Sequence, residues 1–288
     1  MIFGCRGNIN KPDFFNIVSS LNQYFMNTEH KFILSDDIID SENHSELQSI
    51  PRKHIEELAQ DCDIIISIGG DGTILSTLRM IKNAKASVFG IHIGGLGFLA
   101  ECTQENYIEG LNLIIEGNYS VKPRMLLKAE INNGNLQTYY ALNDIVIGQG
   151  RSPRILKTHI NVSDEYLNTY ESDGIIFYTP TGSTAYSLSA GGPIVTPYLD
   201  LIGVTPICPH SLSARPIMLS SNEVISIGFA EEPTGMTITI DGQVHIPIDY
   251  TTEVTIKKAE YSAKMIRLPL KKYFETLRTK MGWAGNVR

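Results

Sequence analysis

An apolar run that ends in glycines is the sequence feature that most constrains this fold. Residues 63–68 (DIIISI) follow a polar segment and lead directly into Gly69-Gly70-Asp71-Gly72-Thr73. A short continuous apolar run is typical of a strand that is buried on both faces of a parallel sheet. Apolar residues then recur at helical spacing over 73–83. The sequence therefore predicts a strand that runs through a glycine turn into a helix.

Strand and helix patterns alternate over the rest of the first 120 or so residues. Residues 32–34 and 87–93 have the composition of strands, and 49–60 has that of a helix. A further helix is expected after Thr103, which can cap it, and before Gly117. This order predicts an α/β domain over residues 1–122, with a parallel sheet and right-handed crossovers.

The pattern changes near Pro123 to short alternating strands that are separated by Gly, Asn, Asp and Pro turns. We expect a β-rich domain over 123–258, with one helical piece near 183–190. The remaining segment, 259–288, contains a polar, basic helix followed by Gly-Trp, and we expect it to pack back on the first domain. The strands expected in the β-rich domain are 126–132, 138–147, 157–162, 174–178, 217–219, 223–227, 236–240 and 253–257.

Composition and charge exclude several classes of protein. The 288 residues suffice for two domains, with 42% hydrophobic and 19% charged residues. A net charge of −7 argues against broad nucleic-acid binding, although backbone amides can still hold a phosphate. No stretch resembles a signal peptide or a membrane span, so we expect a cytoplasmic protein. The four cysteines form no CxxC pair, which favours reduced thiols over a zinc site.

The glycine turn has the features of a phosphate-binding loop. A helix that begins after a buried strand offers unpaired N–H groups and the positive end of its dipole. Gly69, Gly70 and Gly72 let a phosphate chain approach the backbone, and Thr73 adds a hydroxyl. Asp71 would repel a phosphate, so it indicates chemistry or a metal; the alternative is that it only caps the helix. The loop lacks the GKS or GKT of a Walker A motif.

A second glycine-rich segment offers a competing interpretation. Residues 95–100 (GLGFLA) fit G-x-G-x-x-A after a strand, as in a Rossmann dinucleotide site. The fit is poor, because the next helix is expected only from about Thr103 and because Phe98 and Leu99 are bulky in the middle of the turn.

Two later segments have the chemistry of a nucleoside site. Asn143-Asp144 interrupts a strand pattern, either as a bulge or as side chains that bind ribose hydroxyls. Residues 179–193 (TPTGSTAYSLSAGGP) combine hydroxyls with small residues that permit close backbone approach. There Tyr186 can stack on a purine, and Thr184 and Ser189 can hydrogen-bond to a base edge; a turn-rich loop without function is the alternative.

Taken together, these segments resemble the NAD kinase family, from about Asp63 to the Asp241-Gly242-Gln243 turn. GGDGT alone also occurs in diacylglycerol and sphingosine kinases and in some phosphofructokinases, whereas the 179–194 segment at this spacing is highly specific. The resemblance implies an NAD kinase or diacylglycerol kinase-like fold. The segments that carry it are GGDGT (69–73), GGLGFLAE (94–101), LND (142–144), SDG (172–174), TPTGSTAYSLSAGGPI (179–194), PHSLSARP (209–216) and DGQ (241–243).

The resemblance also implies an activity, namely transfer of the γ-phosphoryl group of ATP to the 2′-hydroxyl of the adenosine ribose of NAD. Asp71 would accept the proton, and two half-sites would meet across a domain cleft. ATP phosphates would lie on Gly69, Gly70, Gly72 and Thr73. The residues expected to contact NAD are Asp71, Gly72, Asn143, Asp144, Arg154, Asp173, Thr181, Thr184, Ala185, Tyr186, Ser187, Leu188, Ser189 and Gln243.

Partners follow from the same resemblance. Mg²⁺ or another divalent cation would arrive with ATP, without dedicated protein ligands, and polyphosphate could replace ATP as the donor. A homodimer or homotetramer assembled through the β-rich domain is expected, with no nucleic acid and no membrane. Two positions depart from the family: Asp144 stands where Glu is common, and Glu171 stands where a basic residue sometimes occurs, so Glu171 is given no role.

Two rival functions remain at this point. A lipid kinase of the diacylglycerol type would share GGDGT and a β-rich second domain, but the chain has no exposed amphipathic basic helix for membrane docking. A non-enzymatic NAD(P)-binding sensor would have no need for a carboxylate at position 71. An assay for NADP, with NAD or diacylglycerol as the acceptor, separates all three.

Overall fold

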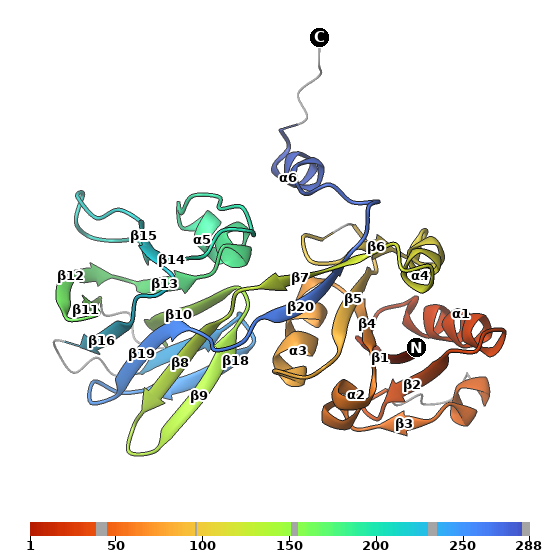
Figure 1. The fold of residues 1–288 in the computed structure, drawn as a ribbon. Coiled ribbons are helices and arrows are strands. Elements are labelled where there is room, and N and C mark those ends of the chain that lie inside the picture. The colour runs from red at the N-terminus through yellow and green to blue at the C-terminus, as the bar shows by residue number, and fades with distance from the viewer. Residues whose placement is uncertain (39–44, 96, 151–154, 230–234, 284–288) are drawn as a thin grey trace, which may run out of the picture. The chain divides into compact units, whose positions relative to one another are not determined.

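The computed structural model describes residues 1–38, 45–95, 97–150, 155–229 and 235–283 (Figure 1). The chain forms two compact units, Met1–Pro123 with Ala263–Arg288, and Arg124–Ser262. No helix among the described residues is both long and apolar enough to cross a membrane. All four cysteines are free thiols; Cys208 is exposed and the other three are buried.

The first unit is built on an eight-stranded sheet with the order β3-β2-β1-β4-β5-β20-β7, in which β6 also pairs with β5. Strands β1 to β6 pair in parallel wherever they are neighbours, and β20 joins β5 in parallel. The strands are β1 (Ile2–Gly7), β2 (Lys31–Ser35), β3 (Arg52–Lys53), β4 (Ile64–Gly69), β5 (Ser87–His92), β6 (Cys102–Thr103), β7 (Ser120–Arg124) and β20 (Ala263–Arg267).

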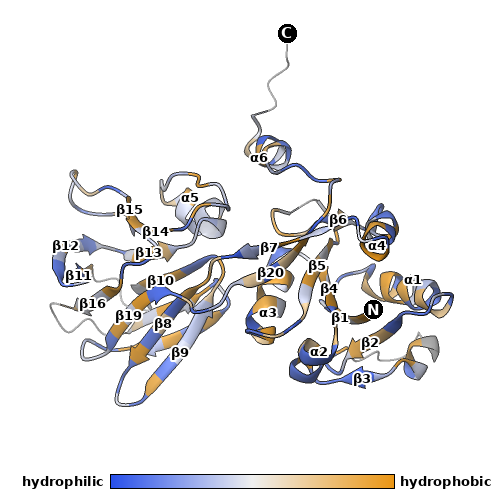
Figure 2. Ribbon diagram, in the orientation of Figure 1, coloured by the Kyte–Doolittle hydropathy of each residue, from blue (hydrophilic) through white to orange (hydrophobic). Residues whose placement is uncertain are grey.

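Helix α1 of the first unit buries one apolar stripe. In α1 the residues Phe14, Ile17, Val18, Leu21 and Phe25 recur at helical spacing and are buried in the same core as the central strands. All residues of β4 are buried, and β4 and β5 are largely apolar in Figure 2. The helices are α1 (Phe14–Met26), α2 (Ile55–Asp61), α3 (Asp71–Ile81), α4 (Tyr107–Ile115) and α6 (Tyr273–Met281), with a 3₁₀ turn at Ser45–Ser49.

The strand order places a topological switch point between β1 and β4. The chain runs from β1 outward to β2 and β3, and then returns to build β4 and β5 on the other side of β1. In open parallel sheets, ligands bind outside the carboxyl ends of the strands at such a point. Residues 69–73 run from the last residue of β4 into the first turn of α3, so they lie at this position.

The second unit consists of two six-stranded antiparallel sheets whose apolar residues form one shared core. One sheet has the order β15-β14-β13-β10-β17-β18 and the other β12-β11-β16-β19-β8-β9. The strands are β8 (Leu127–Asn132), β9 (Leu136–Ala141), β10 (Asp144–Gln149), β11 (Leu156–Val162), β12 (Glu165–Ser172), β13 (Gly174–Tyr178), β14 (Leu201–Ile207), β15 (Ile217–Ser220), β16 (Ile225–Phe229), β17 (Met236–Ile240), β18 (Val244–Ile248) and β19 (Glu253–Lys258).

The predicted fold class is confirmed, an α/β unit with a parallel sheet and a β-rich unit, but several predicted elements are wrong in detail. The helix expected over 49–60 is confined to α2, and Arg52–Lys53 forms a strand instead. The strand expected over 138–147 is two strands that break at Leu142-Asn143. The helical piece near 183–190 is a 3₁₀ turn, Thr181–Thr184, followed by the short α5, Tyr186–Ser189.

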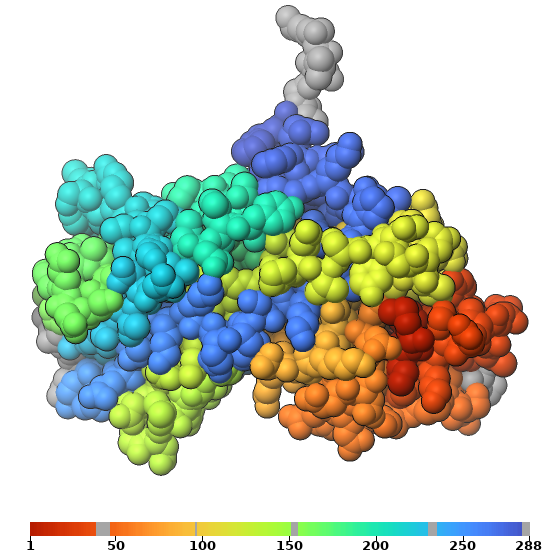
Figure 3. Space-filling model, in the orientation of Figure 1, coloured from red at the N-terminus to blue at the C-terminus, as the bar shows by residue number. Residues whose placement is uncertain are grey.

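The C-terminal segment enters the first unit through a strand that the sequence pattern did not indicate. Strand β20 pairs with β5, with Met265 opposite Val88. Helix α6 follows and is dark blue in Figure 3; it is mostly exposed, with Thr276 and Leu277 as its buried residues. The alternation of β20 covers only five residues, which is too short to separate it from a loop by periodicity.

Candidate functional site

The turn after β4 leads directly into the N-terminus of α3, which is a favourable place for an anion. Helix α3 begins at Asp71 with Gly70 as its N-cap, and the backbone N–H of Thr73 donates to the carbonyl oxygen of Gly70 at 2.9 Å. A Cβ atom at Gly69 would lie 2.4 Å from Oγ1 of Thr73, so only glycine leaves room for that hydroxyl. The predicted phosphate residues Gly69, Gly70, Gly72 and Thr73 thus share one strand-to-helix turn.

The carboxylate of Asp71 is fixed by a different loop rather than by its own helix. Its Oδ2 accepts a hydrogen bond from the backbone N–H of Phe98 at 2.8 Å, and its Oδ1 accepts one from Leu99 at 3.1 Å. Strands β4 and β5 are parallel neighbours with Gly69 opposite His92, which brings the segments after them together. The carboxylate is therefore held at a defined position beside the helix start, which a simple capping role does not require.

Gly97 makes this approach possible. A Cβ atom at this position would lie 2.0 Å from Oδ1 and 2.5 Å from Cγ of Asp71. The Rossmann interpretation of residues 95–100 is therefore wrong, since the segment receives a carboxylate and the next helix, α4, begins only at Tyr107. Leu96 lies outside the described residues.

His92, at the end of β5, borders the same loop. Its Nε2 would lie 3.8 Å from a Cβ atom at Gly70. Burial lowers the pKa of His92, and the nearby negative charge of Asp71 opposes that change only in part. We therefore expect a neutral imidazole beside the phosphate loop at physiological pH. No local sequence signal pairs this histidine with Gly70.

In the second unit, Asp241 organises the Asn143-Asp144 break. Its Oδ2 accepts the backbone N–H of Leu142 at 3.1 Å, while its Oδ1 accepts those of Asn143 at 2.7 Å and Asp144 at 3.2 Å. Asp241 has a φ of 49°, a left-handed conformation in the turn between β17 and β18. The sequence showed Asp241 only as part of a DGQ turn, so its role in shaping residues 142–144 was missed.

A cavity of about 350 Å³ adjoins this break, near the lower end of the range for ligand pockets. It brings together four residues predicted to contact NAD, namely Asn143, Asp144, Ala185 and Tyr186. The other lining residues, which sequence reasoning missed, are Val146, Thr239, Asp241 and Gly242.

The segment that begins at Thr179 is packed tightly on the same break. The hydroxyl of Thr179 donates to the carbonyl oxygen of Leu142 and accepts the backbone N–H of Gly182 at 3.1 Å. A Cβ atom at Gly182 would lie 2.0 Å from the carbonyl oxygen of Asn143. These contacts set the start of α5, where the Tyr186 side chain remains 47% exposed and able to receive a flat ring.

The remaining predicted NAD residues do not line this cavity. Asp173 and Gln243 are exposed in turns, before β13 and before β18. Ser187 is fully buried, and its hydroxyl is hydrogen-bonded to that of Thr205 at 3.1 Å. Arg154 lies outside the described residues. Thr181, Thr184, Leu188 and Ser189 belong to the 3₁₀ turn and α5.

The carboxyl group of Asp144, in the second unit, has a strongly raised pKa. Burial and, to a smaller extent, the nearby carboxylate of Asp241 raise the pKa of Asp144 to about 7, while the backbone N–H of Tyr186 acts in the opposite direction. A carboxyl that titrates near neutrality can accept from a ribose hydroxyl when ionised and donate to one when protonated. Its hydrogen bonding to a ribose would therefore change with pH near neutrality.

This shift predicts a pH-dependent gain in stability for Asp144→Asn. Because the folded pKa lies above the unfolded value, the contribution of Asp144 to stability is fully present below the unfolded pKa and is lost as the pH rises through about 7. The variant lacks this loss, so its Tm relative to the unmodified chain should be higher at pH 8 than at pH 5 by about 3 °C or more. Thermal unfolding at both pH values measures this, with the exposed Asp164→Asn as control. Equal differences at both pH values would contradict it.

Neither a metal-binding group nor a further predicted site was found in the part of the chain that the structure describes. Among the residues that the structure describes, no group of three or more His, Cys, Asp or Glu side chains is placed to hold a metal ion. A larger hollow of about 600 Å³ lies between α2 and the end of α3, where Glu56 and Lys82 are among its lining residues. It contains none of the predicted site residues.

Comparison with known proteins gives consistent results over most of the chain. Residues 16–119 match the model of the ATP-NAD kinase N-terminal domain, and residues 142–268 match that of the ATP-NAD kinase C-terminal domain. An NAD kinase from Syntrophotalea carbinolica is 40% identical over 252 residues, which cover 87% of this chain and 86% of the relative. One from Clostridium botulinum is 43% identical over 228 residues, which cover 79% and 81%.

Solved structures agree in fold. A yeast NADH kinase complexed with NADH superposes with a TM-score of 0.88 at 24% identity, covering 100% of this chain and 89% of that one. An NAD kinase from Archaeoglobus fulgidus in complex with ATP superposes with a TM-score of 0.76 at 26% identity, covering 99% and 100%.

Proposed function

This chain belongs to the NAD kinase family, and from that premise we propose how its residues perform the reaction. It is an enzyme that phosphorylates NAD to NADP with ATP. The finer proposal is that the γ-phosphoryl group of ATP passes to the 2′-hydroxyl of the adenosine ribose, with Asp71 as proton acceptor. The observation that carries it is the Asp71 carboxylate, held by two backbone amides at the first turn of α3.

In this proposal the 2′-oxygen forms a bond to the γ-phosphorus while the bond from that phosphorus to the β,γ-bridging oxygen breaks. ADP leaves, and the hydroxyl proton passes to Asp71. The transition state of phosphoryl transfer is loose, so alignment and charge neutralisation supply most of the catalysis. A carboxylate of fixed orientation suits this task, because it aligns the hydroxyl and accepts its proton late.

We assign the triphosphate to Gly69, Gly70, Gly72 and Thr73 at the start of α3. The amides there and the helix dipole favour negative charge. Mg²⁺ that arrives with ATP would supply positive charge to neutralise the charge developing on the phosphates. The two carboxylate oxygens of Asp71 already accept backbone amides, which fits an ion that would arrive on ATP rather than be held by this carboxylate.

We assign the dinucleotide to the cluster around the 350 Å³ cavity. Tyr186 offers an exposed ring for the adenine, and Asn143 with Asp144 offers amide and carboxyl groups for ribose hydroxyls. Asp173, Gln243 and Arg154 remain proposed contacts on the strength of the family motifs. The proposed assembly, also from the family, is a homodimer or homotetramer through the β-rich unit, which light scattering would test.

A donor and acceptor panel tests the proposed reaction. The purified chain is incubated with Mg²⁺, NAD or NADH, and either ATP or polyphosphate. We expect a product that an NADP-specific dehydrogenase accepts and whose new phosphate is assigned to the 2′ position by NMR. Phosphate at any other position, or failure to form NADP with every donor, would refute it.

Tyr186→Ala tests the dinucleotide assignment. We expect the KM for NAD to rise about tenfold, from the loss of a stacking contact of roughly 1–3 kcal/mol. The KM for ATP should change much less, because the ring serves the acceptor. Steady-state kinetics in both substrates measures this, with the exposed Tyr166→Ala as a surface control. Equal changes in both KM values would count against the assignment.

A further inference from the structure

A lysine from the C-terminal segment is directed at the loop that holds Asp71. The Nζ of Lys271 donates to the carbonyl oxygen of Gly97 at 2.9 Å and of Phe98 at 3.3 Å, and it also contacts that of Ala100. An ammonium group carries three N–H donors, so its capacity is matched to three carbonyl acceptors.

The same peptide groups connect Lys271 to Asp71. The peptide that joins Gly97 and Phe98 accepts from Lys271 through its oxygen and donates to Asp71 through its N–H. The peptide that joins Phe98 and Leu99 does the same. Two peptide dipoles are thus aligned between a cation and a carboxylate, and hydrogen bonds in such chains polarise and strengthen one another.

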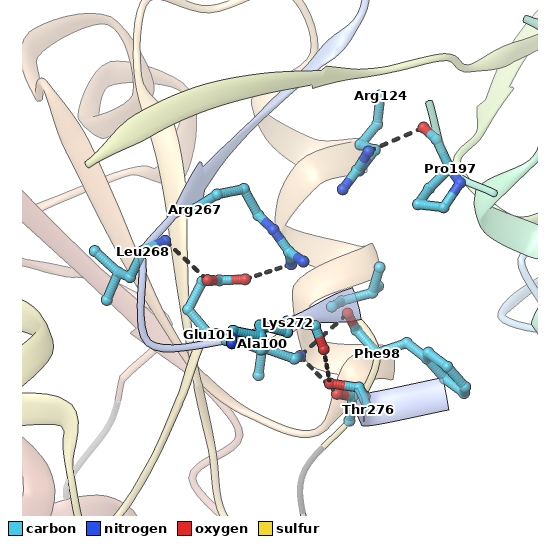
Figure 4. A network of polar contacts seen from close by, with 12 residues as sticks. Phe98, Ala100, Glu101, Arg124, Pro197, Arg267, Leu268, Lys272 and Thr276 are labelled. Atoms are coloured by element: carbon cyan, nitrogen blue, oxygen red, sulfur yellow. Dashed lines mark hydrogen bonds and ion pairs between the residues drawn. The ribbon is translucent and has the colours of Figure 1, made fainter. Parts of the chain in front are cut away.

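The segment is already anchored without Lys271. Strand β20 pairs with β5, and the buried Glu101 forms an ion pair with Arg267 and accepts the backbone N–H of Leu268 at 2.9 Å (Figure 4). Burial and, to a smaller extent, the charge of Arg267 lower the pKa of Lys271 to about 8, although Glu101, Asp71 and Cys102 act in the opposite direction. Burial of a charged ammonium group costs free energy of folding. Attachment of the segment does not require Lys271, so it does not explain why this lysine is buried.

We propose that Lys271 is a positioning residue for the phosphoryl transfer, which fixes the Asp71 carboxylate through the Gly97–Phe98 and Phe98–Leu99 peptide groups. The inference rests on the proposed role of Asp71. It gives the C-terminal segment a part in catalysis that the sequence motifs do not contain. Lys271 would touch neither substrate nor the transferred group.

The test compares Lys271→Met with Lys264→Met. Lys264 lies in β20 and donates to one carbonyl oxygen, that of Ala84, at 3.0 Å, so it controls for loss of a lysine from the same segment. We expect Lys271→Met to lower kcat by roughly 10- to 100-fold, since small misplacements of reacting groups cost this much. The KM values for NAD and ATP should stay within about twofold, and Lys264→Met should leave kcat nearly unchanged.

A double-mutant cycle separates positioning from general destabilisation. If Lys271 acts through Asp71, then Lys271→Met should lower kcat much less in the Asp71→Asn background than in the unmodified chain. Equal effects in both backgrounds, or an unchanged kcat in the single variant, would overturn the proposal. An active Asp71→Asn enzyme would instead refute the proposed function, so the two failures are distinguishable.

If Lys271→Met does not fold, the proposal can be tested by the pH dependence of kcat in Lys271→Arg. In the unmodified chain kcat should fall as the pH rises through about 8 and the ammonium loses its charge. The guanidinium of Lys271→Arg stays charged, so this decline should be absent while kcat at pH 7 stays within about tenfold. A decline of equal size in both proteins would overturn the proposal.

Discussion

Replacement of Asp71 by asparagine should lower kcat by roughly 10²–10⁴-fold, the contribution usual for a positioned acid or base. The amide cannot accept the proton of the 2′-hydroxyl. It also carries N–H donors where the carboxylate accepts the amides of Phe98 and Leu99, so one of those two hydrogen bonds must be lost. The measurement is steady-state NADP formation at saturating NAD and ATP.

Asp13→Asn is the matched control for this change. Asp13 precedes α1 in the same unit, and its side chain makes no capping hydrogen bond. We expect it to leave kcat unchanged, while both variants keep a Tm within a few degrees of the unmodified chain. If Asp71→Asn retained more than a third of the kcat, Asp71 could not be the proton acceptor.

The strand, turn and helix at residues 63–83 could be predicted because their signals are local. The buried run of β4 and the apolar spacing of α3 are both contained within a few residues. The partner of Asp71 could not be predicted in this way. Phe98 and Leu99 follow the neighbouring strand, and their segment was first noted for a superficial likeness to a Rossmann motif. Only the parallel pairing of β4 with β5 converts that glycine-rich segment into a receptor for a carboxylate.

The residues that act across long separations in sequence were missed for the same reason. Asp241 binds the amides of residues 142–144 from almost a hundred positions away, and a DG dipeptide ordinarily indicates no more than a turn. Lys271 is one of several lysines in a basic tail and has no motif of its own. The family resemblance points to the reaction and to the motifs, whereas the fold shows which distant residues, such as Asp241 and Lys271, contact those motifs.

Gly97→Ala should be nearly as damaging as the loss of the carboxylate, although it removes no functional group. The new methyl group would lie 2.0 Å from Oδ1 of Asp71, well inside contact distance. Asp71 cannot move aside at small cost, because both its oxygens are bonded to the residues that follow Gly97. We expect kcat to fall about 100-fold, as for an angstrom-scale misplacement of a reacting group, with a loss of stability of about 1–3 kcal/mol from overpacking.

Gly95→Ala, two residues earlier, provides the control that isolates the contact. A Cβ atom there would meet nothing within 4 Å, so the same chemical change is made in the same loop without a clash. If kcat in Gly97→Ala equalled that in Gly95→Ala, the Asp71 carboxylate would tolerate displacement and its fixed orientation could not matter to the reaction. If instead kcat falls only in Gly97→Ala, and falls little further when combined with Asp71→Asn, the loop acts on the chemistry through that carboxylate.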